Sequence, residues 1–408
     1  MSRAQPPIAV LVALSAVGPL ALNMFVPSMP GLAATFAADY GTVQLTLSLY
    51  LIGLAVSQLA YGPLSDRFGR RPLMLAGIGL FLVGTLIALL AQSIGMLIVG
   101  RLVQAIGGCA GLVLSRAAVR DLFDRERSAS VIATITMVMV VAPMVAPLIG
   151  GYLDQWFGWR ANFWLVGAFA VVVLGFAVPL LHETNHYRQP LPGLSGMIGS
   201  YAILLRSPVY RAHIALIGFA SGAFFAFLGA APFVVIDLMG HPPSDYGRWF
   251  ALGAAGYMAG NFASSRLAVR VGLCRLIQAG MGFMAAGAAL MLTLALAGQM
   301  TLLALFGPMA MIAIGNGLVL PSGNAGALSV DRRRAGAASG LSGFMQMGLG
   351  AGISTLAGHL VVDSALPLAA IMAVSVAISL LAFHALRRAN RQARELAART
   401  RPALPKAA

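Results

Sequence analysis

One arginine lies well inside a long apolar stretch, where a charged side chain needs partners or water. Arg101 is about six residues, or about 9 Å, inside the stretch over residues 95–117. An unpaired cation at that depth costs at least about 2.5 kcal/mol. Gln104, Gly108 and Gly111 follow at helical spacing on the same face, and the glycines let a neighbouring helix come close. Two interpretations stay open: Arg101 reaches the outer membrane interface, or it is a buried cation that senses protonation or orients a polar substrate.

Aromatic, methionine and amide side chains in the apolar stretches could contact a weakly polar ligand. Flexible methionines and aromatic faces suit varied apolar molecules, and amides inside a span need hydrogen-bond partners. The candidate substrate-binding residues are Asn23, Tyr50, Arg101, Gln104, Met137, Phe224, Phe227, Asn316 and Gln346. Most such residues pack the core or face lipid, so packing stays the alternative for each.

A charged loop after the second apolar stretch has the spacing G-x-x-x-D-R-x-G-R-R. Gly62 permits close helix approach, and Gly69 permits a turn with positive φ. Asp66 can pair with a neighbouring arginine, Arg67 or Arg70. A pair that breaks when two halves of the protein rock apart would make this loop a conformational latch. The simpler interpretation is a turn whose positive charge only fixes its side of the membrane.

The fifth apolar stretch contains two prolines and a glycine pair. Pro143 and Pro147 are four residues apart, and Gly150 and Gly151 follow. Each proline removes a backbone hydrogen bond, so we expect this helix to bend and to form a contact or hinge between halves. Such kinks in membranes are often only structural, and this alternative stays open.

Membrane-spanning helices must position all of these residues. The 408 residues are 59% hydrophobic and only 10% charged, against about 45–50% and about 25% in soluble proteins, which excludes a soluble enzyme. An all-α integral membrane protein with twelve spans of about 20 residues fits this length. The predicted spans are 8–28, 43–64, 73–92, 95–117, 129–152, 160–181, 211–237, 248–268, 274–297, 301–322, 336–360 and 365–386. They form two six-span bundles, 1–181 and 211–386, joined by a linker, 182–210, and followed by a basic tail, 387–408.

Positive charge is distributed on one side of this arrangement. With the N-terminus inside, 24 of the 27 basic residues face inward, which leaves Arg101, Arg160 and Arg248 on the outward side. This bias predicts that both termini are cytoplasmic, and it accounts for the net charge of +15. We expect the basic tail to lie on anionic lipid and not on nucleic acid.

Histidine and cysteine residues give no sign of catalysis or metal binding. Among six histidines, only His182 and His186 have ligand-like spacing, and they lie in a loop without a supporting acid pair. Cys109 and Cys274 lie in separate apolar stretches. The sequence therefore predicts no metal site and no cofactor, and it disfavours a membrane-embedded enzyme.

Four segments resemble motifs of a known family. The charged loop is similar to the signature of the major facilitator superfamily between spans two and three. Residues 101–108 (RLVQAIGG) resemble its R-x-x-Q-G motif, and residues 142–151 (APMVAPLIGG) its antiporter motif. Residues 227–234 (FLGAAPFV) narrow the resemblance to the bicyclomycin-resistance and chloramphenicol-efflux (Bcr/CflA) exporters.

This resemblance implies two pseudo-symmetric six-helix bundles in a bacterial inner membrane. It further implies a working monomer that exports drug-like molecules by alternating access and proton antiport. The expected midplane cavity lies between Asn23, Tyr50, Arg101 and residues of spans seven and eleven.

The chain departs from the family pattern at its expected proton site. The family has an Asp followed by Met, Tyr, Leu and Pro in span one, where this chain has Asn23 in the segment NMFVP. Asn cannot ionise between about pH 5 and 9. Transport then proceeds without protons at this site, or another group such as Asp237 titrates, or Asn23 holds one conformation. A proton-independent facilitator or a nutrient or metabolite transporter of the same fold is the alternative function.

Overall fold

The computed structural model describes residues 6–186, 194–331 and 334–399, and the regular elements within these ranges are all helical. The helices are α1 (Ile8–Phe25), η1 (Val26–Ser28), α2 (Met29–Thr35), α3 (Tyr40–Phe68), α4 (Arg70–Leu89), α5 (Ile94–Leu122), α6 (Arg125–Phe157), α7 (Arg160–Leu180), α8 (Leu194–Arg206), α9 (Pro208–Phe233), η2 (Val234–Leu238), α10 (Pro243–Val271), α11 (Leu273–Leu296), α12 (Leu302–Ser329), α13 (Ala335–Leu360) and α14 (Leu366–Arg399).

Each predicted span corresponds to one long helix in the described residues. Nine of these helices are long and apolar enough to cross a membrane by length and hydropathy. The others, α6, α10 and α13, have 33, 29 and 26 residues and are long enough to span. Helix α6 packs against α10, and α13 packs against α3.

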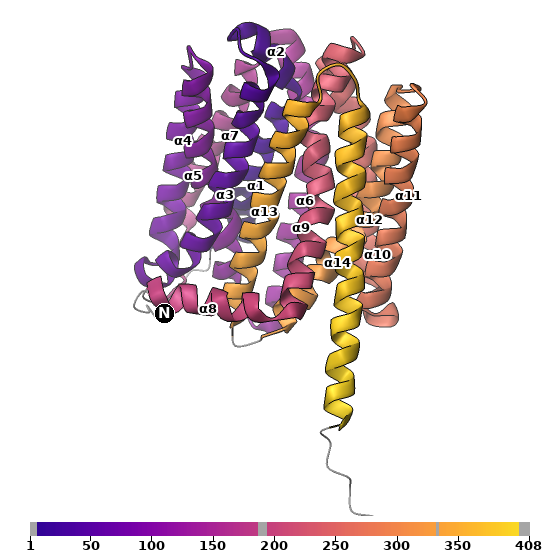
Figure 1. Ribbon diagram of the computed structural model, residues 1–408. Coiled ribbons are helices and arrows are strands. Elements are labelled where there is room, and N and C mark those ends of the chain that lie inside the picture. The colour runs from indigo at the N-terminus through magenta and orange to yellow at the C-terminus, as the bar shows by residue number, and fades with distance from the viewer. Residues whose placement is uncertain (1–5, 187–193, 332–333, 400–408) are drawn as a thin grey trace, which may run out of the picture.

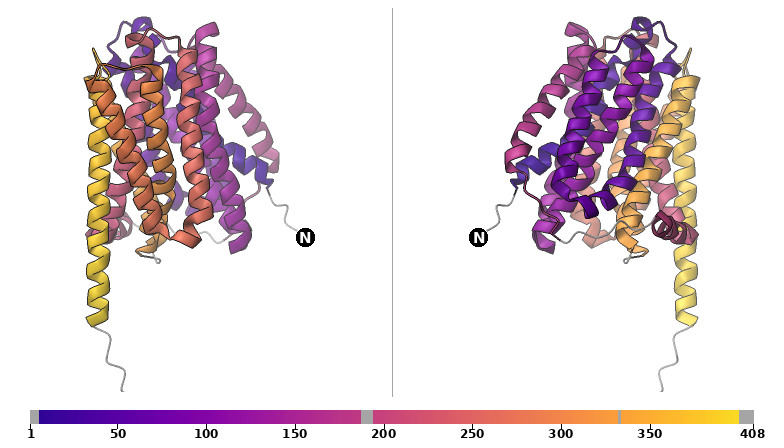
Figure 2. Two further views of the ribbon diagram at one scale, coloured as in Figure 1. Left: turned by 90° about the vertical axis from the view of Figure 1, so that its right-hand side faces the viewer. Right: turned by 90° about the vertical axis from the view of Figure 1, so that its left-hand side faces the viewer.

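The long helices form two groups that meet along two seams (Figures 1 and 2). Helix α5 packs against α1, α3 and α4 in the first group, and α9 packs against α12, α13 and α14 in the second. The seams between the groups are α3 with α13 and α6 with α10. Any site shared by the two groups must lie along these seams.

Helix α8 runs across the ends of the spanning helices (Figure 1). We call this side of the molecule the linker end and the other side the opposite end. Ile198, Ile203 and Leu205 are exposed on α8, whereas Leu204 is buried against α9 residues. Helix α8 therefore has the exposure pattern of an amphipathic helix that lies along a membrane surface.

Helix starts and turns follow from particular residues. Asp39 caps α3 by accepting hydrogen bonds from the Thr42 hydroxyl and the Thr42 amide, which lower the pKa of the Asp39 carboxyl. Gly69 joins α3 to α4 with φ +102°, and Gly272 joins α10 to α11 with φ +85°. These two turns occupy the same place in each group, because each follows the second spanning helix of its group.

Candidate functional site

Arg101 is fully buried inside the first helix group. Its side chain is 0% exposed, so the interpretation that it reaches the membrane interface is wrong. One guanidinium nitrogen, Nη1, donates to the Ala21 carbonyl oxygen at 3.1 Å and to Gln104 Oε1 at 2.6 Å. The guanidinium carbon lies 4.1 Å from the Tyr50 ring centroid and 4.5 Å from that of Phe25. Ring faces and neutral oxygens therefore stabilise this cation.

A chain of hydrogen bonds holds the partners of Arg101. Gln104 Nε2 donates to the Thr85 hydroxyl at 2.8 Å, and this hydroxyl donates to the Phe81 carbonyl oxygen. The Tyr50 hydroxyl donates to the Gly18 carbonyl oxygen at 2.9 Å. These bonds link α1, α3, α4 and α5, so moving the guanidinium requires several helices to move.

The arginine cluster has no carboxylate. Among the described residues, none places a carboxylate within ion-pair distance of Arg101, and its Nε and Nη2 atoms have no hydrogen-bond partner. Asn23 lies on α1 between Ala21 and Phe25, both of which contact Arg101. The Asn23 amide donates to the Pro19 carbonyl oxygen at 2.8 Å, and its Oδ1 is buried without a partner. A carboxylate at position 23 would therefore put an anion on the segment that contacts an incompletely hydrogen-bonded cation.

Asp237 is not part of this cluster. It lies in η2, at the opposite end of the second group, and its side chain is exposed. Arg101 and Asp237 belong to different helix groups, and the role of Asp237 in proton coupling stays a prediction.

A cavity of about 190 Å³ lies within the second helix group. Four predicted substrate residues, Phe224, Phe227, Asn316 and Gln346, line it together. The Phe224 ring lies 6.3 Å from that of Phe250, and the Phe227 and Phe306 rings meet edge to face at 5.3 Å. Asn316 is 2% exposed and its Oδ1 has no partner, so the cavity offers aromatic walls and few polar groups.

Several lining residues were not predicted from the sequence: Ser221, Phe250, Gly253, Ala254, Tyr257, Phe306, Met309, Ala313 and Leu320. For three of these residues, the helical spacing in the sequence could have predicted their position. Phe306, Met309 and Ala313 precede Asn316 at three- and four-residue steps, so they share its face of α12. Extending the stripe from the predicted amide would have found them.

In the described residues, the structure does not show the single midplane cavity that was expected between the two groups. Asn23, Tyr50, Arg101 and Gln104 lie together in the first group, whereas Phe224, Phe227, Asn316 and Gln346 lie together in the second. Glycines explain why Arg101 points inward: a Cβ at Gly107 would meet α4 backbone, and one at Gly111 would meet the Leu14 carbonyl oxygen. Close approach of α1 and α4 encloses this face of α5. The Met137 side chain lies outside the described residues.

Comparisons with known proteins decide the family. Residues 11–355 match the family described as the Major Facilitator Superfamily. The chain belongs to this superfamily. It is therefore a multi-pass membrane transporter and not an enzyme.

Two relatives and one solved structure illustrate the similarity. A bicyclomycin resistance protein homolog of Haemophilus influenzae is 33% identical over 388 residues, which are 93% of this chain and 96% of that protein. A chloramphenicol resistance protein of Pseudomonas aeruginosa is 29% identical over 67% of this chain and 64% of its own length. A D-xylose–proton symporter structure superimposes with a TM-score of 0.73 at 12% identity, covering 91% of this chain and 96% of that one, which shows the shared fold.

The superfamily loop forms an ion-pair network within the first group. Arg70 pairs with Asp66 at 2.7 Å and with Asp121 at 3.0 Å, whereas Arg67 is exposed and lies over the Phe68 ring. Gly69 has the predicted positive φ. The prediction for Gly62 was wrong, because a Cβ there would meet nothing within 4 Å.

Glu183, just after α7, is the partner that the sequence analysis missed. Its carboxylate accepts from the backbone amides of Arg70 at 2.9 Å and Arg71 at 3.3 Å. A Cβ at Gly69 would clash with this carboxylate, so glycine is required there for space as well as for φ. The described ion pairs of the loop do not cross to the second group, and the role of the loop as a latch between halves stays a prediction.

The segment that resembles the antiporter motif, residues 142–151, packs on both groups. A Cβ at Gly150 would meet the Met24 carbonyl oxygen of α1, and one at Gly151 would meet backbone at Pro243 and Ser244 of α10. The Pro147 carbonyl oxygen lies against Gly247. Helix α6 is continuous through both prolines, and the Pro143 side chain lies outside the described residues. The glycines thus let α6 contact both halves, whereas the hinge stays a prediction.

The two halves are joined by hydrogen bonds at the opposite end. The Tyr40 hydroxyl donates to the Gly229 carbonyl oxygen at 2.7 Å, and Gln44 Nε2 donates to Ser354 Oγ at 2.6 Å. Arg248 Nε donates to the Tyr152 hydroxyl at 2.7 Å across the other seam. At the linker end, a pocket of about 440 Å³ separates α3 and α5 from α13. The transporter is therefore closed at the opposite end and hollowed at the linker end.

Proposed function

We propose that this transporter exports small, weakly polar drug-like molecules of the bicyclomycin and chloramphenicol type, as a member of the Bcr/CflA branch. The observation that carries the proposal is the aromatic cavity, whose walls include Phe224 and Phe227 and whose few amides include Asn316 and Gln346. Such a surface suits varied apolar ligands. The names of the two similar resistance proteins support the same class of substrate.

Export requires that the closed end open and the hollowed end close. The one-sided basic residues predict a cytoplasmic linker end in a bacterial inner membrane. Substrate then enters from the 440 Å³ pocket. Separation of α3 from α9 and α13 at the opposite end, with loss of the Tyr40 and Gln44 bonds, releases it outside. One chain contains both halves, so a monomer holds all the parts that this mechanism uses.

The state of position 23 decides how transport is driven. In the leading mechanism a proton exchanges for drug, and Arg101 responds to the charge of a neighbouring carboxyl. This chain has Asn23, and its arginine cluster contains no carboxylate among the described residues. That observation favours a second candidate, a proton-independent facilitator or metabolite transporter of the same fold.

Uptake of labelled chloramphenicol into inverted membrane vesicles tests the proposal, with and without an imposed proton gradient. We compare the natural chain with Asn23→Asp and with the matched control Asn261→Asp. Asn261 also donates to a carbonyl four residues earlier, that of Tyr257, but lies in the second group. We expect gradient-driven accumulation with Asn23→Asp only, because its carboxylate would lie on the segment of α1 that contacts Arg101.

Each other outcome has a definite meaning. Equal, gradient-independent equilibration in all three proteins supports the facilitator. Gradient-driven accumulation by the natural chain means that the coupling carboxyl lies elsewhere, and Asp237→Asn is the next variant. If no variant transports chloramphenicol or bicyclomycin, the proposed substrate class is wrong.

A further inference from the structure

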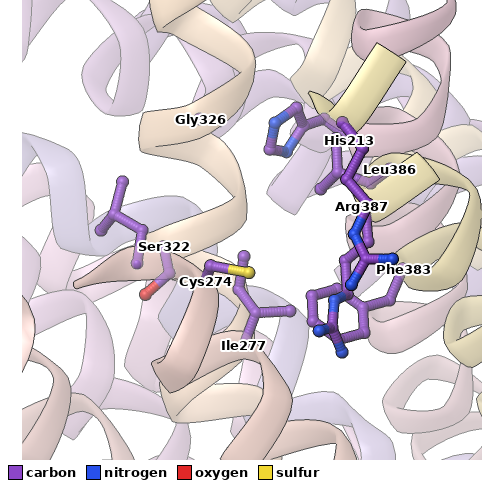
Figure 3. Close-up of a pocket in the computed structure, with 10 residues that line it drawn as sticks. His213, Cys274, Ile277, Ser322, Gly326, Phe383, Leu386 and Arg387 are labelled. Atoms are coloured by element: carbon purple, nitrogen blue, oxygen red, sulfur yellow. The ribbon is translucent and has the colours of Figure 1, made fainter. Parts of the chain in front are cut away.

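A second large cavity lies at the linker end of the second group, away from the aromatic cavity. Its volume is about 420 Å³, and it is bounded by α9, α11, α12 and α14. Figure 3 shows Ser322 and Cys274 on one side and His213 and Arg387 on the other. None of its described lining residues lines the aromatic cavity. The drug-export mechanism therefore gives it no role.

The cavity combines positive charge with unused hydrogen-bonding groups. Arg387 and Arg391 are four residues apart on one face of α14, and both line it. His213 is 7% exposed and Ser322 is 1% exposed, yet His213 Nδ1 and Ser322 Oγ have no hydrogen-bond partner among the described residues. No acidic side chain is among the described lining residues. These groups match a compact anion with several acceptor oxygens.

The remaining walls are apolar. Ile277, Phe383 and Leu386 are buried around the cavity, and Leu273 is 39% exposed at its edge. A freely soluble anion has no use for such walls, whereas an anion that carries hydrocarbon chains can place the chains against them. The cavity thus has the two-part chemistry of an amphiphile.

Its depth fits the boundary of a membrane. About 30 Å of helix separates Leu366 from Leu386 at about 1.5 Å per residue, which is the thickness of a bilayer core. Arg387 therefore lies where the apolar core ends and headgroups begin. Basic pockets between spanning helices at this level bind anionic headgroups.

We propose that this cavity binds the phosphodiester headgroup of an anionic phospholipid from the leaflet at the linker end. Arg387 and Arg391 pair with the phosphate, and His213 and Ser322 donate hydrogen bonds to its oxygens. The acyl chains leave along the apolar edge at Leu273. The bound lipid would tie α11 to α14 at the point where α14 continues out of the membrane.

Cys274 gives a native reporter for this site. It is exposed and lines the cavity, whereas Cys109 is fully buried in the first group. The full chain is placed in nanodiscs of phosphatidylcholine alone or with phosphatidylglycerol, and the rate of maleimide labelling is measured. We expect phosphatidylglycerol to slow labelling, and we expect the double variant Arg387→Gln/Arg391→Gln to remove this protection. In a native mass spectrometry titration, the same variant should lose about 25-fold in phosphatidylglycerol affinity, since each basic residue contributes about fivefold.

The matched control removes two charges from the same end but outside the cavity. Arg270→Gln/Arg388→Gln should keep the protection, because both side chains are exposed and neither lines the cavity. Ser322→Ala, which changes no charge, should weaken it. Equal labelling rates in both lipids, or equal loss of protection in the charge control, would overturn the proposal. If millimolar inorganic phosphate protects Cys274 in pure phosphatidylcholine, the site binds a free anion, and the proposal of a lipid is wrong.

Discussion

The two helix groups place their polar chemistry in opposite ways. In the first group, Arg101 is enclosed by rings and carbonyl oxygens, and no space for a ligand remains around it. In the second group, a cavity of about 190 Å³ is surrounded by aromatic rings, with Asn316 and Gln346 as its amides. The arginine cluster thus holds a charge without volume, and the aromatic cavity holds volume without a charge.

This difference separates two tasks that a single cavity would combine. A cation in a packed cluster changes its environment only when helices move, so it suits sensing of a conformation or a proton. An uncharged aromatic cavity can accept varied molecules without a desolvation cost for a buried ion. Communication between them then runs through the seams α3–α13 and α6–α10.

Replacement of Arg101 by Met should give the largest effect on transport. The variant removes the cation that contacts Ala21, Gln104 and Tyr50, so uptake of drug should fall by at least about 100-fold, equivalent to about 2.7 kcal/mol. The free energy of unfolding should stay equal or rise by about 1–4 kcal/mol, because Met replaces a buried cation without a counter-ion. Vesicle uptake and thermal unfolding of the purified protein measure the two effects.

For Arg101→Met we expect uptake to fall while the free energy of unfolding does not, and this combination is what tests the role of the arginine. Loss of both would mean that Arg101 mainly holds the first group together. Retained transport would mean that the packed charge has no part in the cycle, and the contrast between the halves would lose its functional meaning.

Filling the aromatic cavity should give the next largest effect. Gly253 lies on its wall, and a Cβ there would meet only Met309 Cγ, at 3.7 Å, an ordinary contact. Gly253→Ala should therefore transport normally, whereas Gly253→Met should lower uptake about tenfold by occupying the cavity. Gly282→Met is the matched control, since a Cβ at this exposed glycine would meet nothing within 4 Å. Equal uptake by both methionine variants would place the substrate outside this cavity.

The same contrast explains how much could be predicted from the sequence. Long apolar stretches and one-sided charge predicted every spanning helix, because burial in lipid requires them. Arg101 and Gln104 were found on one face of α5 from helical spacing alone. Spacing did not predict that this face of α5 would be enclosed. The enclosure depends on how closely α1 and α4 approach, which is a tertiary property.

Partners distant in the chain were beyond single-sequence reasoning. Glu183 and the charged loop are more than one hundred residues apart, and only packing of α7 against α4 brings them together. The α10 wall of the aromatic cavity follows the same rule, since Phe250 has ordinary core spacing within its own helix. Helix spacing predicts a shared face, but not the neighbour that the face meets.

The smallest predicted effect concerns a bond that joins the halves. Tyr40→Phe removes the hydrogen bond to the Gly229 carbonyl oxygen at the opposite end. One such bond contributes about 0.5–1.5 kcal/mol, so the population open at this end should rise about fivefold. Spin labels at Gln155 and Leu238, both exposed at the opposite end, report the opening as a longer distance.

Tyr61→Phe separates this effect from the general loss of a tyrosine hydroxyl. The Tyr61 hydroxyl donates to the Ile106 carbonyl oxygen at 3.0 Å, and both residues belong to the first group. Removing this bond should leave the distance distribution unchanged, because nothing between the halves is broken. If Tyr61→Phe shifts the distribution as much as Tyr40→Phe, then packing inside one half controls opening. In that case the seam bonds are a consequence of closure and not one of its causes.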